Sequence, residues 1–254
     1  MSTNPSRRAS CEFSGRPDGS RRLGAAIPMC AACEVREHTF CAALNDEEVA
    51  SVQAIVRQVR LAPGQMLFQE GDEAENVFNV VSGIIKLYKL LPDGRRQITG
   101  FLHPGDFLGI AAGGRYSYNT EAIGTVTLCR FPRRALYRLF DRFPKLERRL
   151  LGIATDELTA AQDQMLLLGR KTAIEKIASF LLMLADRAGV EDGGDDPVPV
   201  PMTRNDIADY LGLTMETVSR TLGRMKRDGL ITTSEPHCVG LTRRDAIEEL
   251  AEGF

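Results

Sequence analysis

The chain of 254 residues lacks long apolar runs. No stretch approaches the roughly 18–20 uninterrupted apolar residues that a transmembrane helix needs, so we do not expect the chain to span a membrane. Arg7 and Arg8 stand near the amino terminus, but Ser, Pro, Gly and charged residues follow them in place of the apolar segment of an export signal. The sequence therefore predicts a cytoplasmic protein.

Histidine is scarce, and the motifs of common enzyme classes are missing. The histidines are His38, His103 and His237, and none of them stands beside a nucleophile motif. Neither a G-x-S-x-G string nor a phosphate-binding P-loop string occurs. We therefore predict that the protein is not an enzyme.

Net charge is also small, because 32 Lys and Arg face 34 Asp and Glu, which leaves −2. Such an average neither indicates nor excludes nucleic-acid binding, since a basic face can be offset by acidic segments elsewhere. Residues 1–29, for example, carry about +3 from five Arg against Glu12 and Asp18. Their Arg, Ser, Gly and Pro content is typical of a flexible tail.

Cysteine, by contrast, is frequent. Six cysteines in a chain without an export signal point to metal or redox chemistry rather than to structural disulfides. Cys30, Cys33 and Cys41 fall within twelve residues, and thiolates are the ligands that iron–sulfur clusters and zinc both prefer. A [4Fe-4S] cluster needs a fourth ligand, for which Cys129 at the end of a predicted β run is a candidate.

Two other interpretations of these cysteines stay open. His38 completes a C-x2-C-x4-H-x2-C string that could bind zinc as a Cys3His site, with Cys129 as an ordinary buried residue. A thiol–disulfide switch is the third interpretation. Cys11 in the tail and Cys238 near the carboxyl terminus are interpreted as bystander thiols, although Cys238 could be an oxidation-sensitive point close to DNA.

The next part of the chain predicts a short helix followed by a β domain. Val49, Val52 and Val56 recur at helical spacing over residues 45–59, and Asn45 or Asp46 can cap the start. Turn signals then follow every 7 to 12 residues, with short β-prone runs between them. These runs are 65–69, 77–81, 84–90, 97–101 and 126–131. Many short strands at this spacing predict an antiparallel barrel, sandwich or roll.

A long helix is predicted after the β domain, with an apolar stripe that is close to a heptad repeat in places. The stripe consists of Leu146, Leu150, Ile153, Leu158, Ala161, Met165 and Leu168. It is longer than one helix of a small domain usually buries, which favours a dimer seam. Packing of the stripe on the chain's own β domain is the alternative. A second helix is predicted over residues 174–184.

The carboxyl-terminal part predicts a helix-turn-helix. Thr203 can cap a first helix, Gly212 can end it as a C′ glycine, and Thr214 can cap a second helix. The buried stripe of this second helix is predicted to be Val218, Leu222 and Met225. Two short β runs, 229–233 and 239–242, lie around a polar turn and fit the wing of a winged helix.

The second helix has a polar face that could read base edges. Glu216, Ser219 and Arg220 lie opposite its apolar stripe, and these residue types pair with cytosine, with several bases and with guanine respectively. Residues 214–228 carry a net charge of about +2, which suits phosphate contacts. A solvated charged face is the alternative interpretation. The further DNA-contacting residues that we predict are Thr203, Thr214, Thr217 and Arg224.

Four strings in the sequence carry a family resemblance. They are TRNDIADYLGLTMETVSR (203–220), MLLLGRKTAIEKIASF (165–180), LHPGDFLG (102–109) and GQMLFQEG (64–71). With them, the chain resembles the Crp/FNR-family transcription regulators over about residues 44–250, and the FNR, FnrL, FnrN and FixK group in particular. The family's Glu-x-x-Ser-Arg signature falls on Glu216, Ser219 and Arg220. The resemblance implies an activator that binds TTGAT-like half-sites of a DNA palindrome as a homodimer and acts with RNA polymerase.

The resemblance also implies an oxygen-labile [4Fe-4S] cluster on Cys30, Cys33, Cys41 and Cys129, whose intact form favours the dimer and DNA binding. The seven-residue gap before Cys41 departs from the enteric FNR pattern and fits the FnrN and FixK variant. A regulator of the same fold without a cluster, controlled by zinc, a thiol switch or another effector, is the alternative function.

Cyclic nucleotides are not expected as ligands. Relatives of this fold that bind cAMP carry Arg-Ser-Ala or Arg-Thr-Ala and a Gly-Glu string. The corresponding strings here are Asn119-Thr120-Glu121-Ala122 and Gly105-Asp106. Glu121 thus places an acid next to the expected position of the phosphate.

These features together predict an α+β protein with an N-terminal antiparallel β-roll like that of cyclic-nucleotide-binding domains, a long dimerisation helix and a C-terminal winged helix-turn-helix. We divide the chain into a tail (1–29), a cysteine-rich cluster-binding segment (30–43), a β-roll sensor (44–141), a dimerisation helix (142–169) and a DNA-binding domain (170–254).

Overall fold

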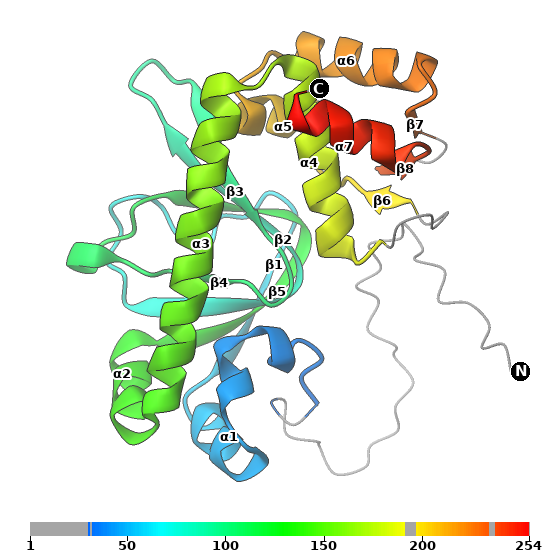
Figure 1. The fold of residues 1–254 in the computed structure, drawn as a ribbon. Coiled ribbons are helices and arrows are strands. Elements are labelled where there is room, and N and C mark those ends of the chain that lie inside the picture. Colours follow the sequence, from blue (N-terminus) through cyan, green and yellow to red (C-terminus); the bar gives the residue numbers. More distant parts are fainter. Residues whose placement is uncertain (1–29, 31, 191–196, 234–236, 254) are drawn as a thin grey trace, which may run out of the picture. The chain divides into compact units, whose positions relative to one another are not determined.

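The computed structural model describes residues 30, 32–190, 197–233 and 237–253 (Figure 1). The described residues form two compact units, of which one extends to Gln162 and the other begins at Asp163. The predicted tail, with Cys11, lies outside the described residues. No helix in the described part of the chain has the length and apolar character needed to cross a membrane.

The first unit opens with two short 3-10 helices, η1 (Arg36–His38) and η2 (Phe40–Ala43), and then α1 (Asp46–Gln53). Asn45 caps α1 as predicted, because its side chain accepts from the Glu48 N–H at 2.9 Å and the Glu48 carboxylate accepts from the Asn45 N–H at 2.9 Å. The predicted extension of this helix to residue 59 is wrong. The helix ends at Gln53, and the chain continues as β1 (Arg57–Leu61). This strand pairs antiparallel with residues 126–130 of the sheet.

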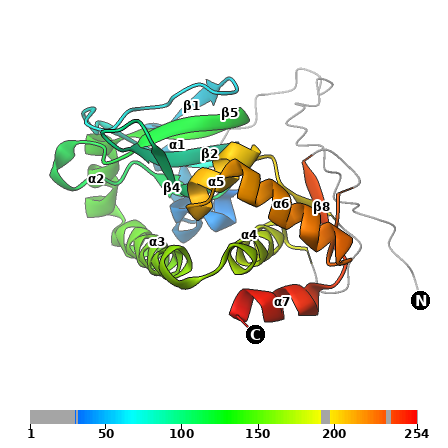
Figure 2. The same ribbon diagram turned by 90° about the horizontal axis from the view of Figure 1, so that it is seen from above.

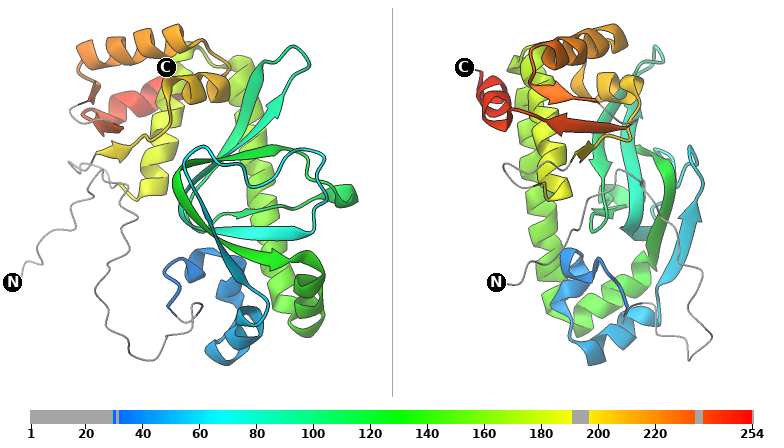
Figure 3. Two further views of the ribbon diagram at one scale, coloured as in Figure 1. Left: turned by 180° about the vertical axis from the view of Figure 1, so that it is seen from behind. Right: turned by 90° about the vertical axis from the view of Figure 1, so that its right-hand side faces the viewer.

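That sheet is antiparallel, as predicted. Its remaining strands are β2 (Asn76–Leu90), β3 (Arg96–Leu102), β4 (Phe107–Leu108) and β5 (Asn119–Pro132). The order is β1-β5-β2-β3, with β4 also paired to β2 (Figure 3). In Figure 3, β2 and β5 are the long curved strands on which the rest of the sheet is built. The short helix η3 (Ala112–Gly114) lies between β4 and β5.

Strand β2 joins two runs that the turn signal Ser82-Gly83 separates in the sequence. Gly83 has a φ of +79°, and the pairing with β5 shifts register on both sides of Ser82. A side chain at Gly83 would place its Cβ 2.4 Å from the Thr125 carbonyl oxygen. The glycine therefore bends the strand and admits the neighbouring backbone instead of ending the strand.

The predicted strand at residues 65–69 is absent from the sheet of the described residues. The Thr120 hydroxyl accepts from the N–H groups of Leu67 and Phe68, at 3.3 and 3.0 Å. A side chain of β5 thus takes the place of a backbone acceptor, so this segment follows β5 without forming a regular ladder.

Two helices follow the sheet, α2 (Arg133–Arg142) and α3 (Pro144–Arg170). They are separated at Phe143, whose φ of −131° and ψ of 77° are non-helical, because a residue before proline avoids the α region. The predicted apolar stripe of α3 divides into two parts. Leu146 is fully buried, and Leu150 and Ile153 pack against the same hydrophobic core.

Further along α3, the apolar side chains face solvent in the single chain. Leu151, Leu158 and Met165 are 67%, 59% and 64% exposed. Their spacing of seven residues places them on one stripe of the helix. The amino-terminal part of the predicted stripe therefore packs on its own domain, whereas an exposed heptad stripe begins at Leu151.

The second unit contains the predicted helix-turn-helix and wing. Its elements are α4 (Ala173–Ala188), β6 (Val198–Pro199), α5 (Arg204–Leu211), α6 (Met215–Arg227), β7 (Ile231–Thr232), β8 (Cys238–Leu241) and α7 (Arg244–Glu252). The strands form a small sheet in the order β6-β8-β7. Helix α7, which the sequence analysis did not predict, lies beside α4 (Figure 2).

We predict that Gly83→Ala destabilises the first unit more than Gly64→Ala does. Both glycines have positive φ, of +79° and +75°, so alanine costs about 1–2 kcal/mol of strain at either position. Only at Gly83 would the new Cβ also meet a backbone oxygen, which adds about 1–3 kcal/mol of overpacking. Denaturant unfolding of the two variants measures the difference, and equal losses would contradict the close backbone approach at Gly83.

Candidate nucleic-acid interface and cysteine pocket

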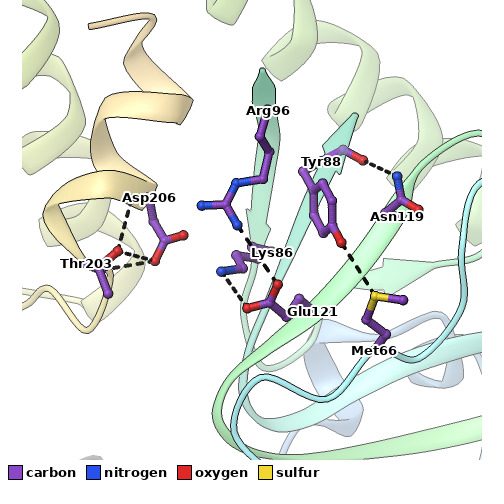
Figure 4. Close-up of polar contacts among 8 residues, drawn as sticks. All are labelled: Met66, Lys86, Tyr88, Arg96, Asn119, Glu121, Thr203 and Asp206. Atoms are coloured by element: carbon purple, nitrogen blue, oxygen red, sulfur yellow. Dashed lines mark hydrogen bonds and ion pairs between the residues drawn. The ribbon is translucent and has the colours of Figure 1, made fainter. Parts of the chain in front are cut away.

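The two helices of the candidate interface are fixed at their ends by side-chain caps. The Thr203 hydroxyl accepts from the Asp206 N–H at 3.1 Å and donates to the Asp206 carboxylate at 2.6 Å (Figure 4). Gly212 ends α5 with a φ of +62°, the left-handed conformation expected of a C′ glycine. Thr214 caps α6 by accepting from the Thr217 N–H at 3.1 Å.

The carbonyl end of α5 receives two further side chains. Lys176 of α4, although buried, donates from Nζ to the Leu211 carbonyl at 3.1 Å, and Gln164 donates from Nε2 to the Tyr210 carbonyl at 2.9 Å. A cation at this end also complements the helix dipole. Sequence periodicity did not reveal either residue, because both follow the pattern of polar positions on amphipathic helices.

Helix α6 packs its predicted apolar stripe inward and leaves a polar face in solvent. Val218, Leu222 and Met225 are buried. Glu216 and Arg220 form an ion pair at 3.5 Å, and each side chain is 72% exposed. Such exposed pairs contribute little to stability, so the guanidinium is available for another acceptor.

The remaining predicted contacts differ in their surroundings. Ser219 and Arg224 are exposed on α6, and Arg224 lies 3.5 Å from the Asp228 carboxylate. Thr217 is half-buried, and its hydroxyl lies 2.9 Å from that of Thr214. The Thr203 and Thr214 hydroxyls cap helices. The roles of all these residues in DNA binding stay predictions.

Four cysteines meet around one pocket of the first unit. Cys30, Cys33, Cys41 and Cys129 all line it, together with mostly apolar neighbours. The first three come from the segment before α1, and Cys129 comes from β5. The four cysteines predicted from the sequence therefore lie around one pocket, although Cys129 is about 90 residues away from the other three.

The segment that carries three of these thiols is anchored by its aromatic residue. Phe40 is completely buried, with its ring 5.5 Å from that of Phe107 and 5.2 Å from that of Phe131. The Thr39 hydroxyl accepts from the Cys41 N–H at 3.2 Å and so fixes the start of η2. Cys41 consequently faces β5, the strand that carries Cys129.

The electrostatics of the pocket favour neutral thiols when no cation is bound. Burial raises the pKa of Cys41 and that of Cys129 to about 12, and it also raises the pKa of Cys30. Burial is the largest cause of these shifts, and the neighbouring cysteines contribute in the same direction, because each negative charge opposes the next. A bound metal centre would therefore have to displace protons from these sulfurs.

The donor set in the pocket suits an iron–sulfur centre, since it consists of four soft thiols in apolar surroundings. In the described part of the chain, no three His, Cys, Asp or Glu side chains converge as tightly as a single metal ion requires. His38 is exposed and is not among the residues that line the pocket. Its Cβ instead lies against the turn at Gly105.

A partly buried ion pair lies in the β domain at the position considered for cyclic nucleotides. Lys86 is buried, and its Nζ lies 2.7 Å from Oε1 of Glu121 (Figure 4). Arg96 approaches the other carboxylate oxygen at 4.0 Å. A phosphate placed beside Glu121 would be repelled by its carboxylate, which Lys86 and Arg96 already share. That cyclic nucleotides are not ligands stays a prediction.

Comparison with known proteins identifies the family. The model of the cyclic nucleotide-binding domain matches residues 58–143, and that of the Crp-like helix-turn-helix domain matches residues 175–250. The nitrogen fixation regulation protein FixK of Bradyrhizobium diazoefficiens is 46% identical over 80% of this chain and 86% of its own length. The chain belongs to the Crp/FNR family of transcription regulators.

Further Crp/FNR relatives agree with this assignment. The transcriptional activator protein FnrL of Cereibacter sphaeroides is 40% identical over 81% of this chain and 84% of its own length. The solved structure of FixK2 from Bradyrhizobium japonicum matches with a TM-score of 0.72 and 37% identity, over 77% of this chain and 97% of that one. The protein is a DNA-binding transcription regulator, which confirms the predicted fold class and the prediction that it is not an enzyme.

We predict that Arg220→Ala abolishes discrimination at the guanine of the half-site by this Crp/FNR regulator. The guanidinium is exposed and its ion pair with Glu216 is weak, so it can donate to guanine acceptors instead. The test compares binding to a palindrome of TTGAT-like half-sites and to one with the guanine replaced. Wild-type protein should distinguish them by about 1–3 kcal/mol and the variant should not.

Arg224→Ala is the matched control for that experiment. It removes a guanidinium of similar exposure from the same helix, and we expect it to weaken binding to both DNAs alike and to lower the salt slope by about 1. The same uniform loss for Arg220→Ala would show that Arg220 contacts phosphate and not a base.

Proposed function

We propose that this Crp/FNR regulator senses oxygen or redox state through a [4Fe-4S] cluster held by Cys30, Cys33, Cys41 and Cys129. The observation that carries the proposal is the pocket that these four thiols line together, in surroundings that are mostly apolar. When bound, such a cluster supplies iron–sulfur chemistry that oxygen destroys.

Two features of the pocket favour a cluster over a single zinc ion. The residue that would complete a Cys3His zinc site, His38, is exposed and is not among the residues that line the pocket. Cys129, which a zinc site on the amino-terminal segment would leave unused, lines the pocket instead.

The contacts of the cysteine segment provide a route to α3. Cys30, Cys41 and Cys129 pack against the same hydrophobic core as Leu150 and Ile153 of α3. Lys145 at the start of α3 also forms an ion pair with Glu48 of α1. Binding of the four thiols to one centre would fix this segment against β5. Because Leu150 and Ile153 pack on the same core, the position of the amino-terminal part of α3 would depend on that binding.

The exposed stripe of α3 is the surface that we assign to the homodimer. Leu151, Leu158 and Met165 recur every seven residues on it, with the small residues Ala154 and Ala161 between them. Pairing of two copies would bury this stripe and place two α6 helices on one palindrome of TTGAT-like half-sites. We infer activation with RNA polymerase as the outcome, because FnrL is named as a transcriptional activator.

We predict that protein purified without oxygen contains about four iron and four sulfide per chain and absorbs visible light as clusters do. Exposure to air should bleach it and weaken operator binding by about 5- to 150-fold, the usual range of coupling between two sites. Cys33→Ser and Cys129→Ser should each prevent assembly, whereas Cys11→Ser should not. A colourless, zinc-containing protein that binds its operator equally well in air would contradict the proposal.

We predict that Leu158→Glu dissociates the homodimer and that Leu166→Glu does not. The two leucines are 59% and 60% exposed, but only Leu158 belongs to the heptad stripe. An unpaired carboxylate at the seam costs about 3–5 kcal/mol, equivalent to more than a hundredfold in the dimer dissociation constant. Analytical ultracentrifugation of anaerobic protein measures this constant, and equal effects of both variants would place the interface elsewhere.

A further inference from the structure

Asn79 is a buried polar residue whose side-chain oxygen has no hydrogen-bond partner. It is 2% exposed, and no donor among the described residues reaches its Oδ1. Buried polar groups almost always have a partner, because an unpaired one costs about 1–3 kcal/mol. The pocket that it lines is otherwise mostly apolar, so an apolar residue at this position would avoid the cost.

The position of Asn79 directs this side chain toward the cysteines. Asn79 lines the pocket of the four thiols, and it is the cross-strand partner of Cys129 in the β2–β5 ladder. Side chains of directly opposed residues stand on the same face of the sheet, with their Cβ atoms about 4.5–5.5 Å apart. The carboxamide of Asn79 therefore lies next to the sulfur of Cys129.

The other polar side chains that line the pocket are engaged elsewhere. The Thr39 hydroxyl donates to the Arg36 carbonyl at 3.0 Å. The Arg36 guanidinium donates to the Asp46 carboxylate at 2.7 Å and to the Leu44 carbonyl at 2.6 Å. Of the polar side chains that line the pocket, Asn79 is therefore the described one with a buried atom that lacks a partner.

A carboxamide can present either of its two ends to such a group. Its oxygen accepts and its nitrogen donates, and a half-turn of the terminal torsion exchanges the two with little change in shape. Sulfurs bound to iron carry negative charge and need donors, which the nitrogen end supplies.

We propose that Asn79 donates an N–H···S hydrogen bond to a sulfur of the cluster or of Cys129 and thereby controls how readily the cluster is oxidised. The inference rests on the proposed cluster. Hydrogen bonds to the sulfurs of a cluster are among the factors that set its reduction potential. A donor stabilises the more reduced cluster, so its removal should speed the loss of the cluster in oxygen.

The first test uses full-length protein prepared without oxygen, as wild type and as Asn79→Leu, which has similar volume and no donor. Resonance Raman spectra in H2O and D2O report N–H···S bonds as isotope shifts of the Fe–S stretching bands. The rate of bleaching in air and the iron and sulfide content are measured on the same samples. Val81→Ala is the control, because it changes the volume of the same pocket without removing a donor.

A second pair of variants separates hydrogen bonding from packing. Asn79→Thr and Asn79→Val have nearly the same shape, and only Thr retains a donor. If Asn79→Leu does not assemble a cluster, the isotope shifts and bleaching rates of Asn79→Thr and Asn79→Val are compared with each other instead.

We expect Asn79→Leu and Asn79→Val to lose part of the isotope shift and to bleach about tenfold faster. Asn79→Thr should keep part of the shift, and Val81→Ala should resemble wild type. A wild-type cluster whose spectrum and bleaching rate are unchanged in Asn79→Leu and Asn79→Val would overturn this inference and leave the proposed function intact. Wild-type protein without iron and sulfide would overturn both.

Discussion

The burial of Phe40 is the contact on which the first unit depends. Its ring packs edge-on against Phe107 and Phe131, and through these contacts a segment with little regular structure is fixed to the β domain. Without such an anchor, two short 3-10 helices would have too few hydrogen bonds to hold a defined position. Because the anchor lies directly between Thr39 and Cys41, it also fixes where the thiols meet β5.

The same contact explains why the cysteine pocket and α3 are connected. Phe40, Phe131 and Leu146 belong to one core, so a group bound at the thiols and a change in the position of α3 act on the same packed side chains. Interiors of this density do not deform continuously. On the proposed function, a rearrangement at the thiols would reach α3 through this shared core without a further element.

Much of this arrangement could be predicted from the sequence, and the exceptions have physical causes. Capping by Asn45 and Thr203, the glycine after α5 and the stripe of α6 follow from local rules, which the structure obeys. The end of α1 was misplaced because the pairing of β1 with β5 outweighs a helical pattern of valines, a tertiary effect that periodicity cannot show. The segment predicted as a strand at 65–69 forms no regular ladder because the Thr120 hydroxyl accepts from the N–H groups of Leu67 and Phe68 in place of a backbone carbonyl.

The functional residues also divide into those that local sequence patterns reveal and those that only tertiary contacts reveal. Cys30, Cys33 and Cys41 can be predicted from their spacing, whereas Cys129 is only a candidate at the end of a β run until the family resemblance singles it out. Asn79 was missed, since an asparagine in an apolar strand carries no pattern of its own. Its signal, an unpaired buried oxygen beside Cys129, exists only once two distant strands are paired. Lys176 is similar, because its partner at the end of α5 is set by tertiary packing.

On the proposed function, the free energy needed to couple the cysteine pocket to α3 is small. A coupling of about 1–3 kcal/mol alters affinity by 5- to 150-fold. Withdrawing one leucine side chain from a core costs about 1.5–3 kcal/mol, a value of the same size. Since Leu150 and Leu151 are adjacent on α3 but face the core and solvent respectively, a modest rotation of the helix exchanges burial on one side for exposure on the other. A ligand shifts only an equilibrium between states that it binds unequally. On the proposed function, a cluster that favours one position of α3 by no more than the burial of one leucine would be enough to change DNA affinity.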